Sequence, residues 1–235
     1  MTTRKRISLI ALLSIAVAGV ISPSAHAAAT RYITVSAQGT VKVVPDAVRI
    51  NATATSVAAT SKEALAATAK TATAVRAALK TAKIDTKDIA TQSVSVYPEY
   101  KYTNDGSSTL SGYRGSQSFT ITVRAADTAG SLVDALVLAG GDSLQINGAT
   151  PFVLDSTKSL EAARAAAVKS AKAKATSYAK LMGVKLGKVN YLVENSAPTN
   201  YTPVMAVAKA ESDATVIDLG QQDVSISVTV QWSLL

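Results

Sequence analysis

The chain contains no cysteine, a single histidine and few aromatic residues, which make up 5% of its 235 positions. Without cysteine it has neither disulfide bonds nor a thiol nucleophile. The histidine, His26, lies in an N-terminal segment that we expect to be removed, so the mature chain has no Ser-His-Asp triad and no ordinary zinc site. The composition therefore argues against the common hydrolases and zinc enzymes.

Residues 1–27 have the parts of a signal peptide. Three cations, Arg4–Arg6, precede the apolar run ISLIALLSIAVAGVI, and small residues in AHA suit cleavage after Ala27, with cleavage after Ala29 fitting nearly as well. The apolar run is short for a membrane span, and no later segment approaches the roughly 20 apolar residues that a spanning helix needs. We predict an exported protein of the periplasm, cell envelope or extracellular space, with no transmembrane span in the mature chain. A retained N-terminal anchor is the alternative.

The mature chain, residues 28–235, has a modest positive charge. Removal of three cations lowers the formal charge from +8 to +5. An excess of this size does not indicate nucleic acid as a partner. The 208 remaining residues suffice for a hydrophobic core, and neither a composition shift nor an internal repeat divides them, so we predict a single domain over residues 28–235.

The order of expected elements indicates an α+β fold with a largely antiparallel sheet. Alternating apolar and polar residues predict strands across residues 32–57, and Thr60 with Glu63 forms a capping box before a helix. A hairpin with the turn NDGSSTLSG, a short helix and another strand follow. This β-α-β-β-α-β order is ferredoxin-like, and a long helix and two further strands extend it. Residues 196–220 form a loop longer than compact domains usually carry, predicted to be mobile or to be an interaction element.

The long helix, predicted over residues 157–182, has an apolar face and a lysine face. The apolar face on a helical wheel gathers Leu160, Ala163, Ala167, Ala171, Tyr178, Leu181 and Met182. The lysine face carries Lys158, Lys169, Lys172 and Lys180. Alanine-rich helices commonly carry lysines toward solvent, which is the first interpretation. The alternative is a surface that meets an anionic envelope component, such as phospholipid headgroups or wall polymers.

Two patterns raise the question of catalysis. The stretch SYAK, from Ser177 to Lys180, matches the Ser-x-x-Lys box of penicillin-recognising serine enzymes. Its partner boxes are absent and its serine lies near the end of the helix, so we interpret it as structural. The carboxylates are scattered along the chain, and a glycosidase pair that meets only in space stays open as the alternative.

Four of the eight tyrosines flank the turn NDGSSTLSG: Tyr97, Tyr100, Tyr102 and Tyr113. One interpretation is cross-strand packing along the hairpin. The other is a projection that docks on a second subunit, because tyrosine is favoured at interfaces. Both interpretations stay open.

Several segments together resemble one protein family. They are VSAQGTVKVVPDAVRI, KIDTKDIATQSVSVYPEY, GYRGSQSFTITVR, the run from INGATPF to KLGKV, and DVSISVTVQWSL. In this order they resemble the SIMPL family of exported bacterial proteins, long classed as a domain of unknown function and including periplasmic immunogenic antigens. IDLG stands where the family usually has Pro-Gly before its last strand. The resemblance implies an α+β domain outside the cytoplasm, a tendency to self-assemble and a loose link to stress defence, with no established catalysis and no catalytic residue to transfer.

We therefore expect an exported, non-enzymatic protein that acts by self-assembly or binding and needs no cofactor. The expected partners are copies of the same chain and an anionic envelope component. The alternative function is an envelope enzyme that acts on wall glycans through paired carboxylates.

Overall fold

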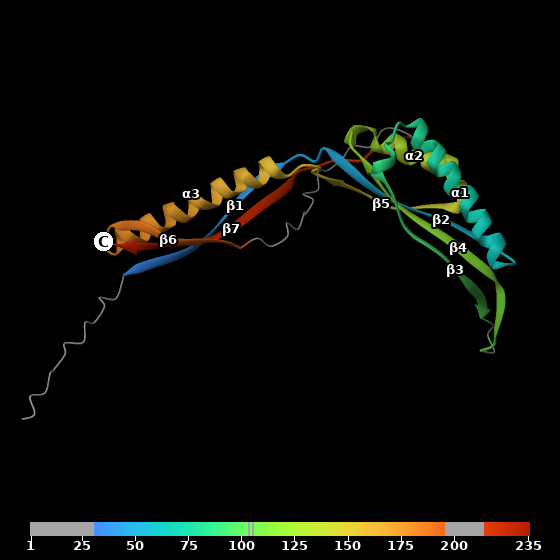
Figure 1. Cartoon of the computed structure of the whole chain (residues 1–235), viewed down its shortest axis with the longest axis horizontal. Helices are drawn as coiled ribbons and strands as arrows, with labels where there is room; N and C mark the ends of the chain where they lie inside the picture. Colours follow the sequence, from blue (N-terminus) through green and yellow to red (C-terminus); the bar gives the residue numbers. More distant parts are fainter. Residues whose placement is uncertain (1–30, 103, 105, 196–213) are drawn as a thin grey trace, which may run out of the picture.

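A computed structural model describes residues 31–102, 104, 106–195 and 214–235 (Figure 1). The predicted signal peptide, residues 1–27, lies outside the described residues, as do residues 196–213 of the predicted long loop. Both assignments stay predictions. No helix in the part of the chain that the structure describes is both long enough and apolar enough to cross a membrane.

The described chain folds into seven strands and three α-helices. The order is β1 (Tyr32–Val43), β2 (Ala47–Ala58), α1 (Ser61–Thr81), β3 (Ile89–Tyr102), β4 (Ser108–Val123), α2 (Ala129–Gly140), β5 (Leu144–Phe152), α3 (Thr157–Leu181), β6 (Leu186–Asn195) and β7 (Gln222–Leu234).

These strands form two antiparallel sheets. One has the order β3-β4-β2-β5 and the other has the order β1-β7-β6. In the first, the chain order β2-α1-β3-β4-α2-β5 gives the strand order of a ferredoxin-like unit, so the predicted α+β fold class is confirmed. Right-handed crossovers place α1 and α2 on the same face of this sheet, while α3 covers the second sheet (Figure 1).

Pro45 lies between the first two strands, which belong to different sheets. It lacks a backbone N–H and lies between β1 and β2, where the ladder is interrupted. β1 pairs with β7 along its whole length, from Tyr32 opposite Ser233 to Val43 opposite Gln222. The beginning and the end of the described chain thus build one sheet, and the middle builds the other.

Each sheet has its own hydrophobic core. The four-stranded sheet packs against α1 and α2 through fully buried side chains that include Ile50, Leu79, Phe119, Ile121 and Leu136. The predicted capping box at the start of α1 is present, because the Glu63 N–H donates to Thr60 Oγ1 and the Thr60 N–H donates to Glu63 Oε2, both at 3.2 Å.

The three-stranded sheet packs against α3 almost entirely through alanine. Every fourth residue of the helix is buried: Ala163, Ala167, Ala171, Ala175 and Ala179. Facing them are valines and isoleucine of β1 and β7 and the buried Trp232. The helix approaches β1 so closely that a Cβ on Gly39 would lie 2.2 Å from the Ala163 carbonyl oxygen. Only small residues fit between such close backbones.

The predicted apolar face of this helix is wrong at its C-terminal end. Tyr178 is 46% exposed, and Leu181 and Met182 are more exposed still. The buried alanines recur at every fourth residue, so over the length of the helix the buried side turns away from the single apolar direction that a helical wheel assigns. Tyr178 therefore lies beside the buried row, next to Ala179, and its replacement by alanine should not cost what a core aromatic costs.

Candidate functional site

The tyrosine-flanked hairpin is formed by β3 and β4, and its end reaches past α1 (Figure 1). β3 is the edge of the four-stranded sheet and pairs with β4 alone within the described chain. Register shifts interrupt the pairing between Thr91 and Ser93 and between Glu99 and Tyr100. Bulges of this kind bend a hairpin and alter the direction of its end.

The four predicted interface tyrosines all lie on this hairpin, and three of them face solvent. Tyr97 and Tyr100 are each 48% exposed and Tyr102 is 77% exposed, whereas Tyr113 is half-buried. No two of the four are direct cross-strand partners in the register of β3 and β4. The rings therefore present apolar area outward at the sheet edge.

An ion pair stiffens the hairpin near these rings. The Arg114 guanidinium on β4 donates to Glu99 Oε1 on β3, and both side chains are about two-thirds buried. Ser111 Oγ also donates to the Glu99 carbonyl oxygen at 2.9 Å. Cross-strand contacts of this kind stabilise the pairing of β3 with β4 around Glu99.

A polar hollow of about 690 Å³ lies beside Tyr97, on the face of the sheet that has no helix. Its lining includes Thr53, Thr55, Tyr97, Arg114 and Ser116. No sequence motif marks this hollow. The sequence pattern that corresponds to it is the alternation of buried residues with threonine and serine along β2 and β4. This alternation is typical of a sheet with one solvent-exposed face.

The four predicted anion-facing lysines, Lys158, Lys169, Lys172 and Lys180, are all exposed on α3. Within the described chain none of them forms an ion pair with a carboxylate. Ser177 and Lys180 of the SYAK stretch lie on the same solvent-exposed part of the helix. Such a surface offers no enclosed site for nucleophilic catalysis.

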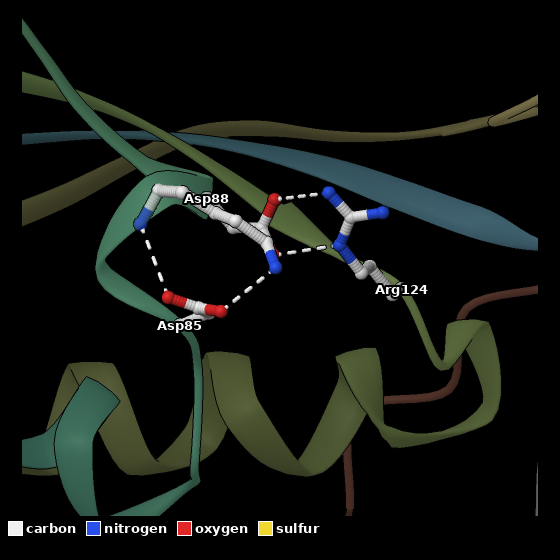
Figure 2. A network of polar contacts seen from close by, with 4 residues as sticks. Asp85, Asp88 and Arg124 are labelled. Atoms are coloured by element: carbon white, nitrogen blue, oxygen red, sulfur yellow. Dashed lines mark hydrogen bonds and ion pairs between the residues drawn. The ribbon is translucent and has the colours of Figure 1, made fainter.

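Two carboxylates that lie three residues apart, Asp85 and Asp88, are both bound to cations (Figure 2). Asp88 accepts two hydrogen bonds of 2.7 Å from Arg124, while Asp85 contacts Lys87 at 2.9 Å. The hydrogen bond from Arg124 lowers the pKa of Asp88, and that from Lys87 lowers the pKa of Asp85. A glycosidase acid needs a raised pKa, so this pair does not fit that role.

The Asp88–Arg124 pair predicts a pH-dependent stability. Because its pKa is lowered on folding, Asp88 stabilises the fold above its unfolded-state pKa, and this contribution is lost as the pH falls through the folded-state pKa. Asp88→Asn should therefore lower the urea midpoint at pH 7. The urea midpoints of variant and wild type should converge at acidic pH. A difference between the two midpoints that stays constant at all pH values would contradict the dependence on Asp88 ionisation.

The described residues also contain no cluster of three or more metal-ligating side chains from histidine, cysteine, aspartate and glutamate. The arrangement thus offers exposed aromatic and cationic surfaces together with an open sheet edge.

Comparison with known proteins assigns the chain to a family. Residues 33–232, which include both sheets, match the family model described as SIMPL, a protein of unknown function (DUF541). The chain belongs to the SIMPL family. The resemblance noted in the sequence is thereby confirmed, and the family model extends from β1 to β7.

Two relatives show how far the similarity reaches. The chain is 32% identical over 131 residues to the uncharacterized protein YggE of Edwardsiella ictaluri, covering 53% of each chain. It is 29% identical over 157 residues to the 26 kDa periplasmic immunogenic protein of Brucella melitensis, covering 61% of each chain. The matches thus span between half and two-thirds of these relatives' lengths.

Proposed function

We propose that this SIMPL-family chain is an exported, non-enzymatic protein of the periplasm or cell envelope that acts through self-assembly. Its similarity to a protein named as periplasmic and immunogenic supports the location. Among the described carboxylates, Asp85 and Asp88 are held in ion pairs with Lys87 and Arg124, which favours a structural role for these two residues. A connection to stress defence stays a prediction.

The observation that carries this proposal is the combination of an open strand edge with exposed aromatic rings. Within the described chain, the second half of β3, from Tyr97 to Tyr102, has no neighbouring strand on its outer side, so a strand of a second copy can pair with it there. Tyr100 and Tyr102 lie at the projecting end of that strand. Tyrosine rings bury a large area at low entropic cost when a second subunit covers them.

Replacing Tyr100 and Tyr102 together with serine should shift the protein toward monomer. Both rings are exposed, so their loss should leave the helical circular dichroism signal unchanged. Light scattering at micromolar concentration measures the particle mass of the mature wild type and the variant. We expect a particle larger than one chain for the wild type and a smaller one for the variant.

The matched control replaces Lys169 and Lys172 with glutamine on the lysine face of α3. This double change alters charge on another exposed surface, and we expect the particle mass to stay that of the wild type. A wild-type monomer throughout the concentration range would contradict the proposal. An oligomer that responds to the lysine change and ignores the tyrosine change would place the interface on α3.

The lysine face is the second candidate surface. Four exposed lysines that form no ion pair with a carboxylate in the described part of the chain can attract an anionic envelope component. Solvation of an alanine-rich helix explains the same charges, so the hairpin remains the primary proposal.

A further inference from the structure

The first half of β3 presents an apolar edge that α1 leaves uncovered. Helix α1 packs mainly on β2 and β4, and Val94 and Val96 of β3 are 56% and 40% exposed. Within the described chain, the outer side of β3 has no neighbouring strand. Backbone donors and acceptors along this edge are therefore available to an added strand.

Both valines point to the same side of the sheet as α1. Val96 lies opposite Gly115, and a Cβ on that glycine would lie 2.6 Å from Thr68 Oγ1 of the helix. Directly opposite residues of an antiparallel pair share a face, so Val96 faces the helix side. Val94, two residues earlier, shares this orientation.

A pocket of about 320 Å³ lies at the start of the same strand. It is lined by Arg76 and Lys80 of α1, by Ile89 and Thr91 of β3, and by Ile84 and Thr86 between them. Its floor is apolar, because Ile84 and Ile89 pack against the core of the sheet. The pocket therefore combines two cations with an apolar base.

Arg76 is held in position within this pocket. Its guanidinium lies 5.1 Å from the centre of the Phe119 ring and donates to Thr91 Oγ1 at 3.2 Å. A guanidinium has five N–H donors, so these contacts leave others for a ligand. Lys80 lies one helical turn further along the same side of α1.

These two cations lack a carboxylate partner among the described residues. The nearby carboxylates of Asp85 and Asp88 are already bound by Lys87 and Arg124. The C-terminal turn of α1 repels anions weakly through its dipole, and two full positive charges exceed that effect. The pocket thus favours an anionic group.

We propose that this edge binds a peptide that ends in a free carboxylate and adds to β3 as an antiparallel strand. An antiparallel strand runs toward the start of β3, so its C-terminus arrives beside Ile89 and Thr91, where Arg76 and Lys80 lie. The apolar side chains of the peptide contact Val94 and Val96. At about 3.3 Å per residue, a segment of about seven residues spans this part of the strand.

The site is separate from the proposed assembly surface. The peptide would cover β3 from Ile89 to Val96, whereas the assembly surface begins at Tyr97. A variant that carries Tyr100→Ser and Tyr102→Ser should therefore still bind the peptide. Loss of assembly and loss of peptide binding can be measured independently.

The test uses an octapeptide of alternating threonine and valine that ends in valine, with fluorescein on its N-terminus. Fluorescence anisotropy compares the free carboxylate form with the same peptide amidated at its C-terminus. We expect the mature protein to bind the carboxylate form about tenfold more tightly, the scale of one charge-assisted hydrogen bond. The same preference is expected in the Tyr100→Ser, Tyr102→Ser variant.

Two exposed substitutions separate the carboxylate contact from the strand contact. Lys80→Gln should lower the affinity for the carboxylate peptide and leave the affinity for the amidated peptide unchanged. Val94→Lys should lower the affinity for both peptides, because it places a charge against their apolar side chains. Lys70→Gln, on the outward side of α1, is the matched control and should change neither affinity.

Four results would overturn the proposal. They are equal affinity for the two peptides, no effect of Lys80→Gln, no effect of Val94→Lys, and no binding of the carboxylate peptide at millimolar concentration. Circular dichroism of each variant shows whether it is folded. If Val94→Lys left the affinity for the carboxylate peptide unchanged, the site would be an anion pocket without strand addition.

Discussion

Gly39→Val is expected to destabilise the three-stranded sheet by more than about 3 kcal/mol, beyond the usual cost of overpacking. The first added carbon would lie 2.2 Å from the Ala163 carbonyl oxygen and 2.2 Å from the Ala167 nitrogen. Both atoms belong to the helix backbone, so no side-chain rotation can make room, and α3 must move away from β1. The fluorescence of Trp232, the one tryptophan of the chain, reports the change because its ring is buried in the same core.

Gln38→Val is the matched control for this substitution. Gln38 precedes Gly39 on β1 and points to the opposite, exposed side of the sheet. Its replacement should change the free energy of unfolding by less than about 0.5 kcal/mol. Equal effects of the two substitutions would contradict the close packing of α3 on β1.

Phe119→Ala is expected to cost about 4 kcal/mol in the four-stranded sheet, within the range for buried aromatic residues. Phe119 is 1% exposed at the centre of that core, beneath α1. Its removal leaves a cavity and also removes the ring on which the Arg76 guanidinium lies. Urea denaturation followed by circular dichroism measures the loss.

The other phenylalanine of the chain, Phe152, provides the comparison. An arginine also lies over its ring, with Arg49 Cζ 4.6 Å from the ring centre, but Phe152 is only half-buried. Phe152→Ala should therefore cost about 1 kcal/mol, in proportion to the smaller apolar area removed from water. Similar losses of unfolding free energy for Phe119→Ala and Phe152→Ala would show that burial does not determine the cost of removing the ring.

Local sequence patterns determined the elements of this protein. The Thr60–Glu63 capping box, the alternation along β2 and β4, and the alanine-rich run of α3 depend on neighbours within a few residues, and the structure contains all three elements. The order of these elements was sufficient to predict the ferredoxin-like arrangement, because right-handed crossovers leave few topologies open. The break between β1 and β2 at Pro45 has a cause that is equally local, the missing backbone N–H.

Contacts between segments distant in the sequence decided the strand pairing and the exposure of side chains. Sequence patterns did not reveal that β1 pairs with β7 rather than with β2, because both neighbours suit the same alternation. They also misplaced Tyr178, since a helical wheel assigns one apolar direction to the whole helix, whereas the buried alanines of α3 recur at every fourth residue. The tyrosines of the hairpin were identified from their positions around a turn, but their exposure depends on β3 being the sheet edge.

The pocket between α1 and β3 is formed only by the tertiary structure and has no counterpart in the local sequence. Arg76 and Thr91 are fifteen residues apart and come together only because the chain crosses back beneath the helix. Arg76 and Lys80 carry no pattern that distinguishes them from the other exposed cations of an alanine-rich helix. What sets them apart is the nearby strand edge and the absence of a carboxylate partner among the described residues, and both depend on how the sheet is assembled. Sequence thus determined which elements form, and long-range packing decided which of their surfaces remain open.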